Sequence, residues 1–173
     1  LCRARSLRRA FHGRSVVPPS TQHVPTTLLE KALLAGTGAA QALADPRNAR
    51  AVGIVGETTG HVALRRLRGR MERHPIGRAV LQDRPLITSS TLPLEWLDGL
   101  PANSFGASYG AFLRRHDFSP DGRTAVQFVD DPELAYVMTR YRQVHDLWHV
   151  LFGLPPSWRG EVALKWLEAA QTG

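Results

Sequence analysis

The amino-acid sequence predicts a mostly α-helical fold, with a single helical domain that follows an N-terminal targeting segment. Three observations predict it. Apolar residues recur at spacings of three and four along residues 131–153, which is the period of a helix with one buried face. Proline, glycine and polar capping residues divide most of the remaining chain into segments of helical length. No Gly-rich phosphate loop and no alternation of strands with helices is present, which argues against an α/β fold.

The first half of the domain contains three predicted helices. Residues 28–44 are rich in Leu and Ala, and a following Asp-Pro pair ends them. An Arg-rich helix covers residues 61–73 until a proline closes it, and a shorter helix follows at 76–83. We expect residues 85–93 to form an extended loop, because they contain too much Ser, Thr and Pro for a strand.

The second half contains three more predicted helices. Residues 104–115 form the first, in which Gly106 and Gly110 indicate a closely packed neighbour. The clearest helix begins with Asp-Pro-Glu at 131–133, where the aspartate can cap it, proline suits the first turn and glutamate complements the positive helix end. After a Gly-Leu-Pro-Pro turn, a serine caps a last helix over residues 157–170.

One face of the helix that starts at residue 131 is apolar and carries histidine. Its members are Leu134, Met138, Tyr141, His145, Trp148 and Phe152. His145 and His149 are four residues apart and share this face, so we expect both imidazoles to point inward.

The formal net charge of +7 lies mostly at the start of the chain. Residues 1–29 contain five arginines and no acid, whereas residues 30–173 keep 17 basic residues against all 15 acids. The domain itself is therefore close to neutral, and no nucleic-acid partner is needed to explain the charge.

Residues 1–25 are predicted to be a disordered mitochondrial targeting segment. They are rich in Arg and Ser and contain no acid, as transit peptides are, and no apolar core of a secretory signal follows the arginines. The alternative is a basic tail that binds an acidic partner. Residues 26–173 are predicted to be a helical metal-binding domain that is incomplete at its C-terminus.

Composition excludes several other classes of protein. The single cysteine, Cys2, excludes an intramolecular disulfide and a zinc or iron–sulfur site built from cysteines. No run of about 18 apolar residues is present, so the sequence predicts no membrane-spanning helix. The tryptophans are expected to anchor the core or an interface: Trp148, Trp158 and Trp166.

The residues that can carry chemistry lie near the end of the apolar-faced helix. His145 and His149 can bind one metal ion through a nitrogen each. Eleven residues separate His149 from Glu161, and the turn between the two helices reverses the chain, so Glu161 can return to the pair. Asp146 lies about 100° further round the helix than His145. It is either a third ligand or a carboxylate that orients an imidazole.

Plainer interpretations compete with a metal site. Both histidines can be hydrogen-bonded core residues, Asp146 can pair with Arg142, and Glu161 can pair with Lys165. The arginines of residues 65–73 form a solvated face on this interpretation.

The ligand set limits the chemistry. Two imidazoles with two carboxylates suit Zn, Mn, Fe or Co. When one carboxylate moves away, a coordination position opens and the metal acts as a Lewis acid. Metalloproteases use His-Glu-x-x-His, and the shorter Asp146 in place of that glutamate disfavours a protease. A metal-dependent hydrolase of phosphate esters is disfavoured because no phosphate cradle is visible.

The pattern His-Asp-x-x-His-x11-Glu resembles the signature of the ubiquinone (coenzyme Q) biosynthesis protein 4 family. Three further blocks resemble the same family: Gly-Glu-Thr-Thr-Gly-His at 56–61, Arg84-Pro85 with the Ser/Thr run after it, and Phe-Val-Asp-Asp-Pro-Glu-Leu-Ala-Tyr-Val at 128–137. The resemblance covers about residues 23–173, and family members continue for a further stretch.

This resemblance implies an all-helical protein, peripheral on the matrix side of the mitochondrial inner membrane. The implied activity removes the C1 carboxylate from a 4-hydroxy-3-methoxy-5-polyprenylbenzoate. The implied ligands of a divalent metal, usually zinc, are His145, Asp146, His149 and Glu161. The implied partners are other ubiquinone-biosynthesis enzymes, the polyprenylated benzoate and the inner-membrane surface. The resemblance is compatible with a homo-oligomer as well as with a monomer.

Two functions follow as alternatives. The first is a metal-dependent carbon–carbon lyase, a decarboxylase in which Asp146 or Glu161 carries the proton. In it, C1 accepts a proton, or an oxygen in an oxidative variant. The second is a non-catalytic scaffold that binds the lipid intermediate and neighbouring enzymes. The small-residue helix 32–44 and the Leu/Trp-rich helices are candidates to line a groove for the polyprenyl tail.

Overall fold

The computed structural model describes residues 23–45 and 48–172, and within them it contains eight helices and no strand. The mostly α-helical prediction is therefore confirmed. In chain order the helices are α2 (Leu28–Ala44), α3 (Ala49–Thr59), α4 (His61–Arg73), α5 (Pro75–Asp83), α6 (Leu94–Asp98), α7 (Phe105–His116), α8 (Pro132–Phe152) and α9 (Trp158–Thr172). Most of the predicted targeting segment, residues 1–22, lies outside the described residues.

Local capping groups fix where the helices begin, which is why the sequence predicted these positions closely. Thr27 forms a capping box with Glu30 at the start of α2. The Asp131 carboxylate accepts the backbone N–H groups of Glu133 and Leu134 at 2.8 and 3.2 Å, and a proline occupies the first turn of α8. α8 ends at Gly153, whose φ of 63° is the left-handed conformation that glycine favours.

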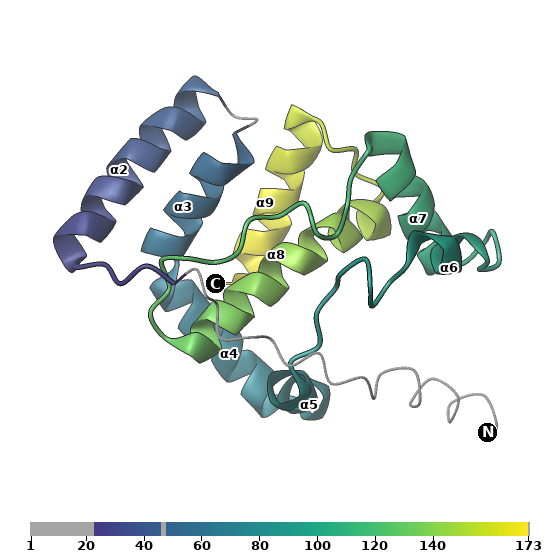
Figure 1. Ribbon diagram of the computed structural model, residues 1–173, viewed down its shortest axis with the longest axis horizontal. Coiled ribbons are helices and arrows are strands. Elements are labelled where there is room, and N and C mark those ends of the chain that lie inside the picture. The colour runs from purple at the N-terminus through teal and green to yellow at the C-terminus, as the bar shows by residue number, and fades with distance from the viewer. Residues whose placement is uncertain (1–22, 46–47, 173) are drawn as a thin grey trace.

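Two helices were not predicted, α3 and α6. α3 contains two glycines and several β-branched residues, which lower its intrinsic helix propensity. It is stabilised by packing against α2, its neighbour in Figure 1: a Cβ added at Gly38 would lie 3.1 Å from Val55 Cγ2. α6 has only five residues and packs against α7. A Cβ at Gly110 would lie 3.0 Å from Leu97 Cβ, so the expected close neighbour of α7 is α6.

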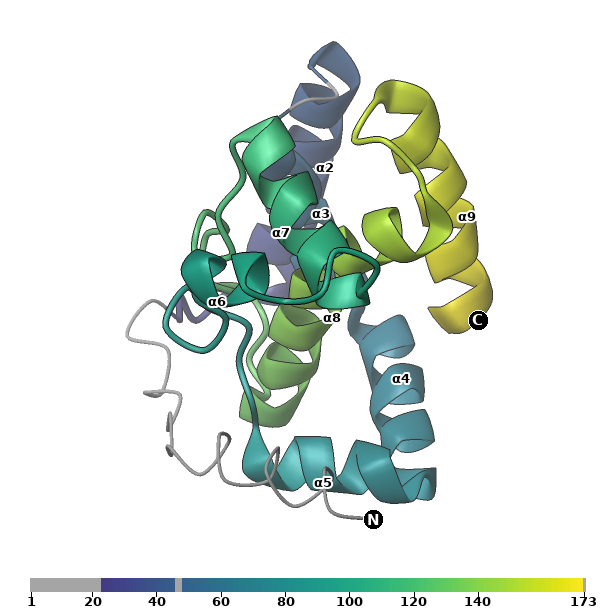
Figure 2. The same ribbon diagram turned by 90° about the vertical axis from the view of Figure 1, so that its right-hand side faces the viewer.

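The helix α8 runs through the middle of the molecule (Figure 2). It contributes to two hydrophobic clusters. Its N-terminal half packs against α4 and the loop before α8; the buried members are Leu64, Val126, Val129, Leu134, Val137 and Met138. Its C-terminal half packs against α6 and α7, where Leu97, Tyr109 and Leu113 are buried. The apolar face of α8 is thus covered from both sides, which places its histidines in a rigid setting.

The predicted loop over residues 85–93 contains no strand. The side chain of Gln143 on α8 holds it by two hydrogen bonds to Ile87. The Gln143 carbonyl oxygen accepts the Ile87 N–H at 3.1 Å, and its amide nitrogen donates to the Ile87 carbonyl at 3.0 Å. An irregular segment is therefore fixed against the central helix.

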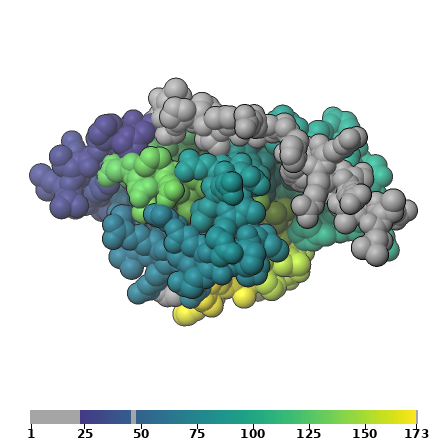
Figure 3. Space-filling view, turned by 90° about the horizontal axis from the view of Figure 1, so that it is seen from below, coloured from purple at the N-terminus to yellow at the C-terminus, as the bar shows by residue number. Residues whose placement is uncertain are grey.

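The arginine-rich helix α4 lies at the surface, on the face formed largely by α4 and α5 in Figure 3. Arg68 pairs there with Glu72 at 2.9 Å and with Glu133 at 2.8 Å. Trp158 and Trp166 are 70% and 75% exposed, so they do not anchor the core. None of the described helices is both long enough and apolar enough to cross a membrane.

Candidate metal centre

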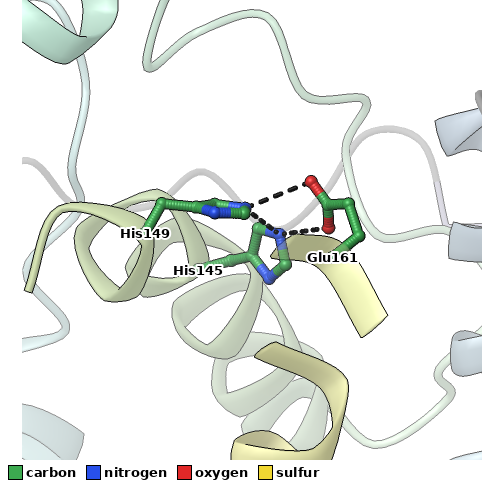
Figure 4. A group of neighbouring side chains, drawn as sticks. All are labelled: His145, His149 and Glu161. Carbon is green, nitrogen blue, oxygen red and sulfur yellow. Dashed lines mark hydrogen bonds and ion pairs between the residues drawn. The ribbon is translucent and has the colours of Figure 1, made fainter. Parts of the chain in front are cut away.

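Three of the four side chains predicted as ligands converge. His145 and His149 point from α8 toward Glu161, which reaches in from α9 (Figure 4). Glu161 Oε2 lies 3.2 Å from His145 Nε2, and Oε1 lies 3.1 Å from His149 Nε2. The two Nε2 atoms are 3.2 Å apart. One ligand atom from each residue thus lies within 4.8 Å of the others, close enough to share one ion.

The turn between α8 and α9 brings the carboxylate to the histidines. Gly153 ends α8 in the left-handed conformation, and the Leu154 N–H then donates to the His149 carbonyl at 2.9 Å. The chain reverses, and α9 returns beside α8. Gly160 makes the close approach possible, because a Cβ there would overlap the Pro155 carbonyl oxygen.

Both imidazoles are anchored through Nδ1, which leaves Nε2 directed at Glu161. His149 Nδ1 lies 3.0 Å from the Leu154 carbonyl oxygen, and His149 is only 1% exposed. His145 Nδ1 lies 2.8 Å from Glu168 Oε1. Metal-binding histidines commonly donate their second ring N–H to a carbonyl or carboxylate in this way. The donor set therefore fits a divalent ion.

Glu168 is part of the site, although it is not among the residues predicted from the sequence. It follows Glu161 by seven residues on α9, so the two carboxylates lie on one helix face. The residue is 3% exposed. The alternative pair of Glu161 with Lys165 is wrong, because Lys165 Nζ donates to Glu168 Oε2 at 2.6 Å. The seven-residue spacing between Glu161 and Glu168 is the feature of the sequence that could have identified Glu168.

The charges of the cluster shift its pKa values in opposite directions. Burial lowers the pKa of His145, but its hydrogen bonds to Glu161 and Glu168 outweigh that effect and raise it. Hydrogen bonds from both histidines hold the pKa of Glu161 well below its ordinary value. Burial raises the pKa of Glu168, but contacts with His145, Lys165 and Tyr141 lower it to about 2. Both carboxylates are therefore ionised at neutral pH, as metal ligands and acceptors must be.

Asp146, the fourth predicted ligand, is placed differently. Its buried carboxylate accepts a hydrogen bond from Arg123 Nη2 at 2.5 Å, and it is not one of the three residues that converge. The alternative pairing with Arg142 is also wrong, because Arg142 Nη1 donates to Glu57 at 2.9 Å. Arg123 and Arg142 line a cavity of about 210 Å³ on this side of α8. Asp146 is thus paired with an arginine that lines this cavity, on the same helix as the two converging histidines.

Aromatic side chains cover His149 on another side. Phe112 of α7 stacks on the His149 ring, with centroids 5.8 Å apart and planes at 17°. His116 in turn lies 4.9 Å from Phe112 and has no part in the cluster. Its neighbour Asp117 serves as the C-cap of α7, so both residues have structural positions outside the metal cluster.

The close approach at Gly160 gives a first prediction. Gly160→Ala is expected to lower the free energy of unfolding by about 1–3 kcal/mol and to weaken metal binding, because α9 must move off Pro155. Urea unfolding and a zinc titration measure the two effects. Gly36→Ala is the matched control: nothing lies within 4 Å of a Cβ there, and alanine should stabilise α2 by about 0.5–1 kcal/mol. Equal stability of the two variants would contradict the prediction.

Comparison with known proteins gives consistent matches. Residues 21–173 match the model of the family described as "Coenzyme Q (ubiquinone) biosynthesis protein Coq4". Relatives named "Ubiquinone biosynthesis protein COQ4 homolog, mitochondrial" match along most of the chain. The rat protein is 48% identical over 96% of this chain and 62% of its own length. The human protein is 49% identical over 90% and 59%, and the Xenopus tropicalis protein is 50% identical over 88% and 55%.

The chain spans about three-fifths of the length of these relatives. No solved structure matches it. The matched range contains the converging histidines and glutamate as well as Asp146 and Glu168.

Proposed function

Since the chain belongs to the family of the coenzyme Q (ubiquinone) biosynthesis protein Coq4, we propose that it acts in ubiquinone biosynthesis as a metal-dependent lyase. The proposed reaction removes the C1 carboxylate of a 4-hydroxy-3-methoxy-5-polyprenylbenzoate. The convergence of His145, His149 and Glu161 is the observation that carries this proposal. A carbon–carbon bond cleavage needs a strong electrophile near a proton carrier, and a purely structural helical domain needs neither.

The residues proposed to hold the ion are His145, His149 and Glu161, with Asp146 as the fourth ligand. Imidazole and carboxylate donors suit zinc, which is the metal we propose. When bound, a divalent ion supplies Lewis-acid polarisation of a carboxylate or phenolate oxygen. Asp146 lies one residue from His145 on α8, and Arg123 now holds its carboxylate. Its part in the ligand set rests on the family resemblance.

The chemistry requires one proton and releases carbon dioxide. The phenol oxygen para to the carboxylate, once deprotonated, pushes electrons to ring carbon C1. C1 takes up a proton, and the bond between C1 and the carboxylate carbon breaks. The electron pair of that bond restores the aromatic ring, and CO2 leaves. One proton is thus consumed for each CO2 released, and no oxidant is needed.

Two carboxylates are the candidates to relay this proton to C1. The side chain of Glu161 is 42% exposed, so it can be reached from outside the cluster. Asp146 is buried, and its charge is balanced by Arg123 beside the cavity. Glu161→Gln and Asp146→Asn separate the two roles, because the variant that lacks the proton carrier loses turnover while the other keeps part of it.

The proposed setting is the matrix side of the mitochondrial inner membrane, with other enzymes of the pathway and the membrane surface as partners. The relatives are named mitochondrial. A stripe on α9 at a spacing of four residues is exposed and apolar: Trp158, Val162 and Trp166. This stripe also favours the second candidate, a non-catalytic scaffold that binds partner proteins and the lipid intermediate. The small residues of α2 are weaker candidates to line a groove for the polyprenyl tail, because Gly38 packs against α3.

The test supplies the purified, zinc-loaded protein with the carboxylated substrate and no partner enzymes. Mass spectrometry should find the decarboxylated product with the unaltered protein and with Glu95→Gln, an exposed control on α6. Glu161→Gln should lose most of the product. A zinc-loaded protein that binds the substrate and never releases product would instead favour the scaffold.

A further inference from the structure

Glu168 is a buried side chain next to the metal cluster, and both of its carboxylate oxygens have hydrogen-bond partners. Its Oε1 contacts His145 Nδ1 at 2.8 Å. Its Oε2 accepts hydrogen bonds from the Tyr141 hydroxyl at 2.7 Å and from Lys165 Nζ at 2.6 Å. Three groups from two helices therefore hold one carboxylate that is 3% exposed.

We propose that Glu168 is a positioning residue that fixes His145 with its proton on Nδ1 and so keeps Nε2 free to bind metal. The inference rests on the proposed metal site and goes beyond the four residues of the motif. Glu168 itself touches the imidazole and is not proposed to touch the ion. The hydrogen bond to Glu168 favours the His145 tautomer with the proton on Nδ1, and it holds the imidazole ring in place.

The direction of the hydrogen bond follows from the donors around Glu168. Lys165 and Tyr141 both donate to Oε2, so the group is an ionised carboxylate that can only accept. His145 Nδ1 must therefore donate to Oε1, and a neutral imidazole then has no proton on Nε2. His149 is fixed in the same sense by the Leu154 carbonyl, which is also only an acceptor. Each Nε2, which lies beside Glu161, is then the ring nitrogen left for the metal.

The variant Glu168→Gln reverses this preference with almost no change in shape. Lys165 and Tyr141 attract the amide carbonyl, which turns the amide NH2 toward His145 Nδ1. Nδ1 must then accept, so the proton moves to Nε2, where it has to be lost before metal can bind. We expect the Kd for Zn²⁺ to rise about 10–100-fold, the usual cost of losing such a supporting contact.

Two measurements test this. Nitrogen chemical shifts of His145 in the metal-free protein, at a pH where the imidazole is neutral, report which ring nitrogen carries the proton. Zinc titrations give the Kd of the same samples. Glu95→Gln, an exposed residue on α6, controls for loss of one negative charge and should match the unaltered protein in both.

A Glu168→Gln protein whose Kd stays within about twofold of the unaltered value would overturn the proposal. So would a neutral His145 in the unaltered protein whose single proton is on Nε2 and not on Nδ1. This second measurement needs no variant, so it decides the matter even where Glu168→Gln fails to fold. The tautomer is read without metal and without substrate. Failure of the decarboxylase test alone would therefore reject the proposed function and leave the role of Glu168 to these two measurements.

Discussion

Replacement of His149 by alanine is expected to abolish tight binding of a divalent ion while the helical fold remains. His149 Nε2 lies 3.2 Å from His145 Nε2 and 3.1 Å from Glu161, so its loss leaves two of the three converging ligands. Loss of a contact that merely supports a ligand weakens binding about 10–100-fold, and loss of the ligand itself should exceed that range. Zinc titration by calorimetry, or the visible spectrum of bound Co²⁺, measures the change.

The stability cost of His149→Ala is separate and smaller. The part-buried Leu154 carbonyl loses its side-chain donor, which costs about 1–3 kcal/mol. His116→Ala is the control: it removes another imidazole from the same aromatic group, one that contacts Phe112 and lies outside the cluster. A His149→Ala protein that binds zinc as tightly as His116→Ala would show that the histidines are ordinary core residues.

Much of the fold could be predicted because its helices begin and end with local signals. These signals are the Asp-Pro-Glu sequence that starts α8, the glycine that ends it, and the proline in the first turn of α5. Each acts on residues only a few positions away in the chain. The meeting of His145, His149 and Glu161 could be predicted for a similar reason. Two residues are one helical turn apart, and the third returns through a short turn.

The features that were missed depend on contacts far along the chain. α3 is a poor helix former by itself and is stabilised by α2. Asp146 is four residues from Arg142, the local pairing, yet its partner is Arg123 from the loop before α8. Glu168 looks in the sequence like any other glutamate of an amphipathic helix. Its burial and its three partners exist only once α9 lies against α8.

The interactions of Glu57 also depend on contacts far along the chain, and we expect its replacement to cause a larger loss of stability than the other variants described above. It lies on α3, is buried, and bridges two other parts of the chain. Its Oε1 accepts a hydrogen bond from Arg142 of α8 at 2.9 Å, and its Oε2 accepts the backbone N–H groups of Gln127 and Phe128 at 2.8 and 3.0 Å. One carboxylate therefore joins α3, α8 and the loop that carries Val126 and Val129 into the core.

Glu57→Ala should lower the free energy of unfolding by about 3–5 kcal/mol, because it leaves two backbone N–H groups without an acceptor and the part-buried Arg142 guanidinium without its carboxylate partner. Arg142 then keeps only its hydrogen bond to the Thr124 hydroxyl at 3.3 Å. Burial already lowers the pKa of Arg142, and Glu57 offsets that effect, so Arg142 depends on this partner to stay charged at low cost. Urea unfolding measures the loss. Glu72→Ala, which breaks only the exposed pair with Arg68 on α4, should cost about 0.2–1 kcal/mol. If the two variants unfold alike, the Glu57 bridge carries no more than a surface ion pair, and another contact must hold the loop against α8.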